Sequence, residues 1–291
     1  MQKRNVLNSP RLLELKRHRR RIILNKILLS LLAFLVIFAL AAYISRIPSL
    51  NISEVKITGH KSVDAEIIKT AAQKEIIGNY LWFFPKTNIL FYPENNLKKE
   101  LQNQFKKLKD ISFSIKDGKT LEISITERIA SYIWCGVNLV VGLPSNSDST
   151  TEGEKCYFVD EAGYIFEEAP YFSGEVYFKF YGLADIGTYF LKENFKQLIY
   201  FKNTLVAMGL KPVSLYIEDN GDIKVFLSAF NKTPTTGPEI VLKISSDFKT
   251  VAENLETALG TEPLLSSLKN KYSSLEYIDL RFGNKVYYKF R

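Results

Sequence analysis

Histidine is almost absent from this sequence, and this limits the chemistry that the chain can perform. The 291 residues contain two histidines, His18 in a basic N-terminal stretch and His60 directly after Gly59. A histidine-based catalytic triad or a two-histidine metal site needs its groups in one folded unit. The charge pattern described below places the two histidines on opposite sides of a membrane. These kinds of site are therefore excluded for a single copy of the chain.

Other signatures of catalysis are also missing. The sequence has no glycine-rich phosphate loop and no Cys/His spacing typical of a metal site. An S-x-x-K pattern occurs at 53–56 and 266–269, but without the S-D-N and K-T-G elements that accompany it in penicillin-binding enzymes. The adjacent acids at 160–161 and 167–168 would diverge on a strand. We expect no cofactor, metal or small-molecule substrate. A membrane-anchored cell-wall enzyme remains the alternative from a different class.

Net charge is missing from most of the chain, because basic and acidic residues balance after residue 26. The formal net charge of +8 arises within residues 1–26, which contain nine basic residues and one acidic residue, Glu14. An uninterrupted apolar run follows at 27–44, and a bilayer core about 30 Å thick needs roughly 20 such residues. The basic cluster predicts a cytoplasmic tail at 1–26, a transmembrane helix at 27–47 and an extracytoplasmic remainder. Contact with membrane lipid explains the tail, so we expect no nucleic acid binding.

A cleaved signal peptide is the alternative interpretation of this region. Ala39 and Ala41 form an A-x-A-like cleavage site. However, the basic region is long, and the apolar run exceeds the 7 to 15 residues that are usual for a signal core. These features favour an uncleaved signal anchor.

Cysteine is also scarce, and both cysteines lie on the predicted exported side. A disulfide between Cys135 and Cys156 is chemically permitted there. It would tie the base of a loop that includes a Ser-, Thr- and Gly-rich segment at 143–154. Closing about 20 residues is worth roughly 3 kcal/mol in the chain-entropy model. Two buried free thiols are the alternative.

The exported sequence begins with a compact alternating pattern at 50–127. It predicts a strand at 52–58 that ends at Gly59, and a helix that starts from an N-cap at Ser62. A second helix is predicted from an apolar stripe at Leu97, Leu101, Phe105 and Leu108. A hairpin then turns at Asp117-Gly118, where a type I′ turn is favoured. The predicted order is strand, helix, helix, strand, strand.

Two aromatic stretches, 82–84 and 91–92, link the two predicted helices. They could form an exposed contact or cover the sheet. Scattered aromatic side chains usually fill cores. We therefore expect core packing here.

Residues 128–291 predict a β-rich domain with two helices, at about 190–208 and from a cap at Ser246 to about 259. The last pattern is a hairpin, with strands at 275–282 and 286–291 joined by Gly283-Asn284. Nothing after it in this sequence can cover the final strand, so we expect an open sheet edge. The predicted fold class is α+β: one N-terminal transmembrane helix, a βααββ domain, and a β-rich domain with an open C-terminal edge strand.

Short local markers recur along the exported sequence in a fixed order. They are Val55, Ile57, Gly59, Glu127, Arg128, Tyr157, Val159, Asp160, Gly163 and the run 278–282. The 50–127 segment resembles a polypeptide-transport-associated (POTRA) domain. With these markers, the basic tail, the single span and the β-rich domain, the chain resembles the FtsQ/DivIB family of bacterial cell-division proteins. The resemblance covers nearly the whole chain, with one departure at Ile129, where the family often has proline.

The resemblance implies a non-enzymatic scaffold of the division machinery, located at the septum. It implies two single-span partners, FtsB (DivIC) and FtsL, recruited by β-strand augmentation at the C-terminal edge. About half of the strand side chains should face the core instead, because strand faces alternate. The residues implied at the interface are Arg281, Phe282, Val286, Tyr287, Tyr288, Lys289 and Phe290.

Outer-membrane assembly and secretion proteins also use POTRA domains and provide another alternative. They need a membrane barrel or a series of repeated domains. The sequence contains neither a run of membrane-type strands nor a second copy of the βααββ pattern. We therefore favour the division scaffold.

Overall fold

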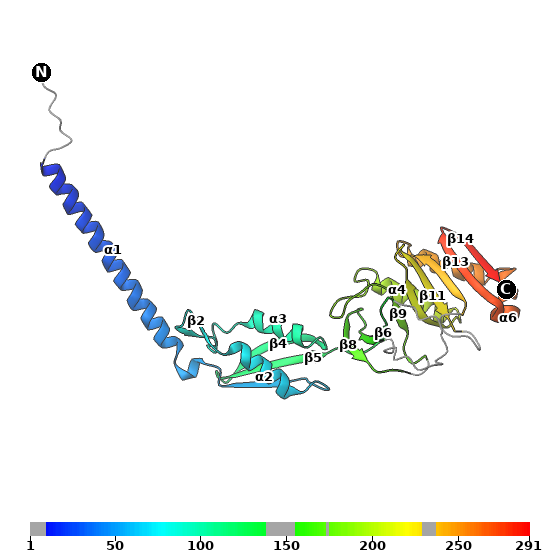
Figure 1. Cartoon of the computed structure of the whole chain (residues 1–291), viewed down its shortest axis with the longest axis horizontal. Helices are drawn as coiled ribbons and strands as arrows, with labels where there is room; N and C mark the ends of the chain where they lie inside the picture. The colour runs from blue at the N-terminus through cyan, green and yellow to red at the C-terminus, as the bar shows by residue number, and fades with distance from the viewer. Residues whose placement is uncertain (1–9, 138–154, 173–174, 229–236) are drawn as a thin grey trace, which may run out of the picture. The chain divides into compact units, whose positions relative to one another are not determined.

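The computed structural model describes residues 10–137, 155–172, 175–228 and 237–291, and it has a mixed α+β fold (Figure 1). Side chains are described from Glu14 onward. The chain divides into two compact units. Unit 1 comprises the chain up to residue 101 together with 110–126, and unit 2 comprises 102–109 together with 127–291. Each unit is described by itself.

The chain begins with one long helix, α1 (Pro10–Ser45). Its Glu14–Ser45 part is long and apolar enough to cross a membrane. At 1.5 Å per residue the 36 residues of α1 extend about 54 Å, more than a bilayer core requires. The helix therefore begins well before residue 27, where the predicted span starts. Leucine, arginine and lysine are good helix formers, so the basic segment continues the apolar helix.

Unit 1 contains a three-stranded sheet with the order β1-β5-β4. The first strand lies parallel to the last, with Val55 opposite Leu121. At the turn between β4 and β5, Asp117 and Gly118 both have positive φ, as a type I′ turn requires. The predicted strand, helix, helix, strand, strand order is present, with one additional short hairpin between the helices. The elements are β1 (Glu54–Thr58), α2 (Ala65–Ile76), β2 (Asn79–Tyr80), β3 (Phe84–Pro85), α3 (Glu94–Gln104), β4 (Leu108–Lys116) and β5 (Thr120–Glu127).

Two helix boundaries in unit 1 differ from the predictions. The N-cap of α2 is Asp64, not Ser62, because the Asp64 carboxylate accepts the amide hydrogen of Glu66 at 2.8 Å. Helix α3 ends at Gln104, so Leu108 is not on its apolar face but begins β4, where it is buried. The first error is a choice between two capping residues two positions apart, and the second comes from extending an apolar period past the end of a helix.

Unit 2 is built on one nine-stranded mixed sheet with the order β14-β13-β12-β11-β10-β9-β6-β7-β8. Its hairpins pair antiparallel, whereas β12–β13, β9–β10 and β6–β9 pair parallel. The two edge strands are β14 and β8. The strands are β6 (Tyr132–Trp134), β7 (Cys156–Val159), β8 (Ile165–Ala169), β9 (Lys179–Tyr181), β10 (Pro212–Ile217), β11 (Asp222–Leu227), β12 (Glu239–Lys243), β13 (Leu275–Phe282) and β14 (Lys285–Phe290).

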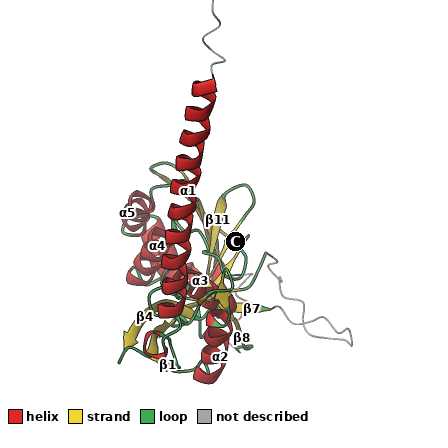
Figure 2. Ribbon diagram, turned by 90° about the vertical axis from the view of Figure 1, so that its left-hand side faces the viewer, coloured by secondary structure: helices red, strands yellow, loops and turns green. Residues whose placement is uncertain are grey.

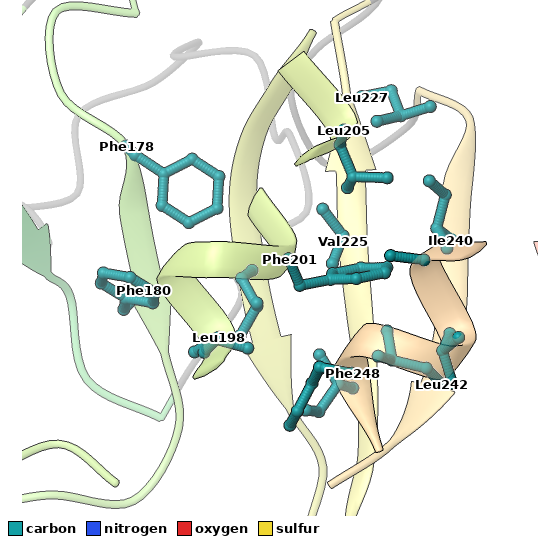
Figure 3. Packing of buried hydrophobic residues seen from close by; sticks show 14 of the residues in the cluster. Phe178, Phe180, Leu198, Phe201, Leu205, Val225, Leu227, Ile240, Leu242 and Phe248 are labelled. Carbon is teal, nitrogen blue, oxygen red and sulfur yellow. The ribbon is translucent and has the colours of Figure 1, made fainter. Parts of the chain in front are cut away.

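Helices α4 (Phe195–Ala207) and α5 (Phe248–Leu259) pack side by side in unit 2 (Figure 2). Between them and the sheet lies the main core, in which the Phe201 and Phe248 rings are 6.0 Å apart (Figure 3). The predicted cap at Ser246 is wrong, because Asp247 accepts the Lys249 amide hydrogen. A short helix, α6 (Leu264–Lys271), was not predicted. Two 3-10 turns occur at Pro48–Leu50 and Tyr272–Ser274.

Cys135 and Cys156 form a disulfide bond, with 2.07 Å between their sulfur atoms. Cys156 is the first residue of β7, and Cys135 directly follows β6. The bond therefore joins two paired strands where the loop between them begins and ends. The 143–154 segment lies outside the described residues.

Candidate partner-binding edge

The last strand of the chain, β14, forms one end of the nine-stranded sheet. It pairs antiparallel with β13, with Ile278 opposite Tyr288 and Asp279 opposite Tyr287. Within the part of the chain that the structure describes, no strand lies along its other side. The final hairpin therefore has the edge position that the sequence predicts.

The backbone of β14 has a definite polarity across the strand. The Arg291 amide donates a hydrogen bond to the Ser274 carbonyl at 2.8 Å, toward the β13 side. Backbone directions alternate along an extended strand, so every second residue points its N–H and C=O the opposite way. The backbone groups of Val286, Tyr288 and Phe290 therefore point toward the open edge. They offer a row of donors and acceptors to an incoming strand.

The side chains of β14 alternate between the two faces of the sheet. Val286, Tyr288 and Phe290 are half-buried and pack against the main core. Tyr287 and Lys289 are exposed on the opposite face of the sheet. The residues whose backbone points to the open edge are thus held by core packing, which fixes the edge in an extended form.

An exposed aromatic pair marks the turn end of this edge. The rings of Phe282 and Tyr287 meet edge to face with their centroids 5.4 Å apart. Phe282 is 56% exposed and Tyr287 is 48% exposed. Aromatic side chains of this kind are enriched in protein interfaces and among residues that dominate binding energy. The pair provides a contact surface next to the open backbone.

Arg281 does not share this accessibility. Its guanidinium donates to the Asp222 carboxylate at 2.6 Å and to both carboxylate oxygens of Asp279 at 2.6 and 2.9 Å. These hydrogen bonds raise the pKa of Arg281. Burial alone would raise the pKa of Asp279, but the hydrogen bonds from Arg281 outweigh it and hold that pKa below its usual range. Arg281 thus positions β13 relative to β11, and its contact with a partner stays a prediction.

Two lysines give the edge its charge. Lys289 forms an ion pair with Glu276 at 3.0 Å, and this hydrogen bond raises the pKa of Lys289. Lys285 is exposed at the start of β14. If a second copy of β14 paired in the same direction, lysine would lie opposite lysine, and like charges in that position are destabilising. The two lysines therefore disfavour parallel, in-register pairing between two copies of β14.

The carboxylates that bind Arg281 were missed in the sequence. Asp222 lies 59 positions from Arg281, and the distance in sequence hides the contact. A signal was present in β13, where Asp279 and Arg281 are two positions apart and share a face of a mostly buried strand. Charges in such a place are usually paired.

Three of the four acidic residues considered as catalytic pairs, Asp160, Glu161 and Glu167, lie in ion pairs elsewhere in unit 2. Asp160 binds the Arg128 guanidinium and accepts the amide hydrogens of Ala162 and Tyr164 at 2.9 Å. Glu161 pairs with Lys109 and Glu167 with Lys107. The Asp160 turn also needs Gly163, because a Cβ there would lie 2.7 Å from the Phe195 ring. These residues have structural partners that account for them.

Over the described ranges, no group of three or more His, Cys, Asp or Glu side chains is arranged to hold a metal ion. No model of a known protein family matches the chain, and a comparison with curated proteins also gives no match.

Proposed function

We propose that this chain is a membrane-anchored, non-enzymatic scaffold of the bacterial division machinery that binds a partner strand along β14. The observation that carries the proposal is the open backbone edge of β14 beside the exposed Phe282–Tyr287 pair. In β-augmentation the main chain supplies affinity, and alternate side chains supply specificity. The sequence resemblance to FtsQ/DivIB proteins, including the POTRA-like βααββ order of unit 1, supports the division role.

The anchor in this proposal is α1, with its basic end in the cytoplasm and the chain after α1 outside. The basic residues before the apolar run support this orientation through the positive-inside rule. Because the anchor holds β14 near the membrane, β14 meets mainly partners that are anchored in the same membrane. Such confinement raises the effective concentration of a second single-span protein near β14.

The partner proposed for β14 is an extended segment of a single-span division protein of the FtsB/DivIC type, with an FtsL-like protein in the same assembly. Opposite Lys285 and Lys289 the segment should carry acidic residues, and opposite Tyr287 it should carry an apolar one. Opposite charges in cross-strand pairs stabilise a sheet, typically by about 0.2 to 1 kcal/mol each. The two lysines thus contribute to selection of the partner.

Crosslinking in cells tests the proposal. A photoreactive amino acid in place of Tyr287 should capture a small single-span protein at midcell. The matched control is Tyr200 on α4, which is 49% exposed against 48% for Tyr287. Its replacement should capture no such protein. Uniform distribution of the chain in the membrane, or equal capture at both positions, would contradict the scaffold proposal.

A proline substitution tests whether the backbone edge itself is used. Val286→Pro removes an N–H that points to the open side, where proline is tolerated in edge strands. Val286→Ala shortens the side chain but keeps the N–H. Loss of one interfacial hydrogen bond, worth about 1 kcal/mol, and the added ring should weaken partner binding roughly tenfold for proline relative to alanine. Equal binding by the two variants would rule out backbone pairing at this position.

A further inference from the structure

Two loops of unit 1 expose large apolar side chains beside the C-terminal end of α1. The first joins β2 to β3 and presents Leu81 and Trp82, which are 76% and 87% exposed, together with Phe83. The second presents Leu90, 72% exposed, and Phe91. The sequence-based expectation that these aromatic stretches fill a core is therefore wrong for Trp82, Phe83 and Phe91. Phe84 and Tyr92 are half-buried.

The first loop is fixed against the helix by side-chain contacts. The rings of Phe83 and Phe84 both meet the Phe38 ring edge to face, with centroids 5.5 and 5.4 Å from it. Arg46, just after α1, donates to the carbonyl oxygens of Trp82 and Phe83, each at 3.3 Å. Figure 1 shows β2 beside the C-terminal part of α1. The loop is thus attached at the level of Phe38.

The second loop is attached to the same helix end by a buried asparagine. The Asn88 amide donates to the Ser45 carbonyl at 3.0 Å, and its side-chain oxygen accepts the Leu90 amide hydrogen at 3.0 Å. Asn88 is almost completely buried. This residue links the last turn of α1 directly to the loop that exposes Leu90 and Phe91.

The residue types at the tip of the first loop are not explained by folding. Leu81 and Trp82 have φ values of +46° and +68°. Residues other than glycine, asparagine and aspartate rarely adopt a positive φ, and the backbone strain costs of the order of 1 kcal/mol or more per residue. Neither side chain gains burial within the chain in return. A leucine and a tryptophan at such positions indicate a contact outside the chain.

The depth of the loops along α1 identifies that contact. Phe38 precedes Ile44, the last residue of the apolar run, by six residues, or about 9 Å of helix. If α1 spans the bilayer, the Phe83 and Phe84 rings lie among the outer acyl chains, and Arg46 ties the same loop to the headgroup end of the helix through the Trp82 and Phe83 carbonyls. Tryptophan and tyrosine are enriched at the boundary between acyl chains and headgroups, where an apolar ring with one polar atom is favoured. Arg46, exposed at the same helix end, suits the headgroup phosphates.

We infer that the 81–83 and 90–91 loops insert into the headgroup region and outer acyl chains of the extracytoplasmic leaflet and hold the part of unit 1 that follows α1 against the bilayer. The inference rests on the span in the proposed function. It adds a second membrane contact, which limits tilting of the β1–β5 part of unit 1 away from the membrane surface. The occupant is lipid, because the loops are attached to the apolar helix at a depth where lipid is the surrounding solvent.

Tryptophan fluorescence tests the inference in the full chain, reconstituted in phospholipid nanodiscs. The chain has two tryptophans, and Trp134 is buried, so it serves as the internal baseline. Lipids brominated near the headgroup should quench Trp82, whereas aqueous iodide should not. Trp82→Phe removes the reporter. In that background, Phe38→Trp reports on the span, and His60→Trp, exposed beyond the far end of β1, reports on the water-facing part of unit 1.

The expected result is loss of most of the Trp82 and Phe38→Trp emission with brominated lipid, and loss of the His60→Trp emission with iodide. If Phe38→Trp is quenched by lipid but Trp82 is quenched by iodide, the span stands and the loop insertion is wrong. If neither is quenched by lipid, the span fails and the inference with it. Shielding of Trp82 from both quenchers would assign the loop to a protein contact and overturn the inference. Lipid quenching of His60→Trp would also overturn it, by showing contact over all of unit 1.

Discussion

The two edges of the nine-stranded sheet in unit 2 are built differently. The β8 edge is partly covered by the chain itself, because Ile165 donates to the Thr188 carbonyl at 3.0 Å and accepts the Gly187 amide hydrogen at 2.8 Å. Two glutamates, Glu167 and Glu168, stand on its remaining length. The β14 edge has no such backbone cover among the described residues, and it adjoins an exposed aromatic pair.

Within this one sheet, one edge strand is protected against pairing and the other is not. Edge strands are templates for unwanted pairing, and proteins usually cover or charge them. Here β8 has both a backbone cover and charged side chains, whereas β14 has only the charges of Lys285 and Lys289. An open edge at one end of a sheet whose other edge is covered is consistent with a strand kept available for a partner.

The largest effect is expected from removing an ion pair near the covered β8 edge. Arg128 and Asp160 are both nearly buried, with side-chain exposures of 9% and 3%. Arg128→Met leaves the Asp160 carboxylate unpaired and should lower the free energy of unfolding of unit 2 by about 3 to 5 kcal/mol. Denaturant titration followed by Trp134 fluorescence measures this change.

The matched control is Lys107→Met, which removes the more exposed pair with Glu167. It should cost less than about 1 kcal/mol. A similar, small effect for both variants would show that the Arg128–Asp160 pair does not stabilise the covered side.

The second prediction concerns the disulfide, which ties β6 to β7 next to the β8 edge. The double variant Cys135→Ala, Cys156→Ala should lose about 3 kcal/mol of unfolding free energy in the chain-entropy model. Crosslinking at Tyr287 should remain at its wild-type level, because the open edge lies at the other end of the sheet. Loss of that crosslinking in a chain that still folds would show that the two edges are coupled.

The third prediction concerns the effect of pH on the Asp279–Arg281 interaction in β13, next to the open edge. The pKa of Asp279 is lowered in the folded chain, so its contribution to stability is present above the unfolded pKa of about 3.9 and is lost as pH falls through the lower folded value. Stability of the wild type should therefore decline below about pH 4. Hydrogen bonds to charged groups are worth about 1.5 to 3 kcal/mol, which bounds the effect.

Asp279→Asn is the comparison for this acid titration, monitored by circular dichroism. The variant should be less stable than wild type at neutral pH, and the difference should shrink as the solution becomes acidic. A difference that stays constant from pH 6 to pH 2 would mean that the Arg281 interaction does not act through the Asp279 charge.

The smallest effect is expected at the exposed ion pair of the open edge. Lys289→Gln should leave the thermal midpoint unchanged, because exposed ion pairs contribute little. Binding of an acidic partner strand should weaken, with a reduced dependence on salt. Glu276→Gln separates these effects, since it removes the same pair but keeps the Lys289 charge. A fall in binding for Glu276→Gln alone would contradict this assignment.

The sequence was most informative where the relevant contacts are local. The final hairpin, the Asp117-Gly118 turn and the apolar stripes of the helices could be read from a few adjacent residues. Contacts between distant segments could not be predicted in this way. The parallel pairing of β12 with β13 brings Glu239 beside Tyr277, and no local pattern specifies that partner.

The open edge could be predicted, but the network behind it could not. The edge follows from the position of 285–290 after the last turn in the sequence. The role of Arg281 depends on Asp222, which comes from a strand two positions away in the sheet. The aromatic linker was misjudged for a related reason, since only its contact with Phe38 shows that Trp82 lies beside an apolar helix.

Amide hydrogen exchange along β14 tests the central claim most directly. In the full chain in nanodiscs, the amides of Val286, Tyr288 and Phe290 should exchange rapidly, while those of Tyr287 and Lys289 and the covered Ile165 amide should be protected. Addition of the partner captured through Tyr287 should slow exchange at the three outward amides by about tenfold or more, as a new hydrogen bond predicts. Protection of these amides in the chain alone, or unchanged exchange with the partner bound, would contradict an open edge that pairs with another strand.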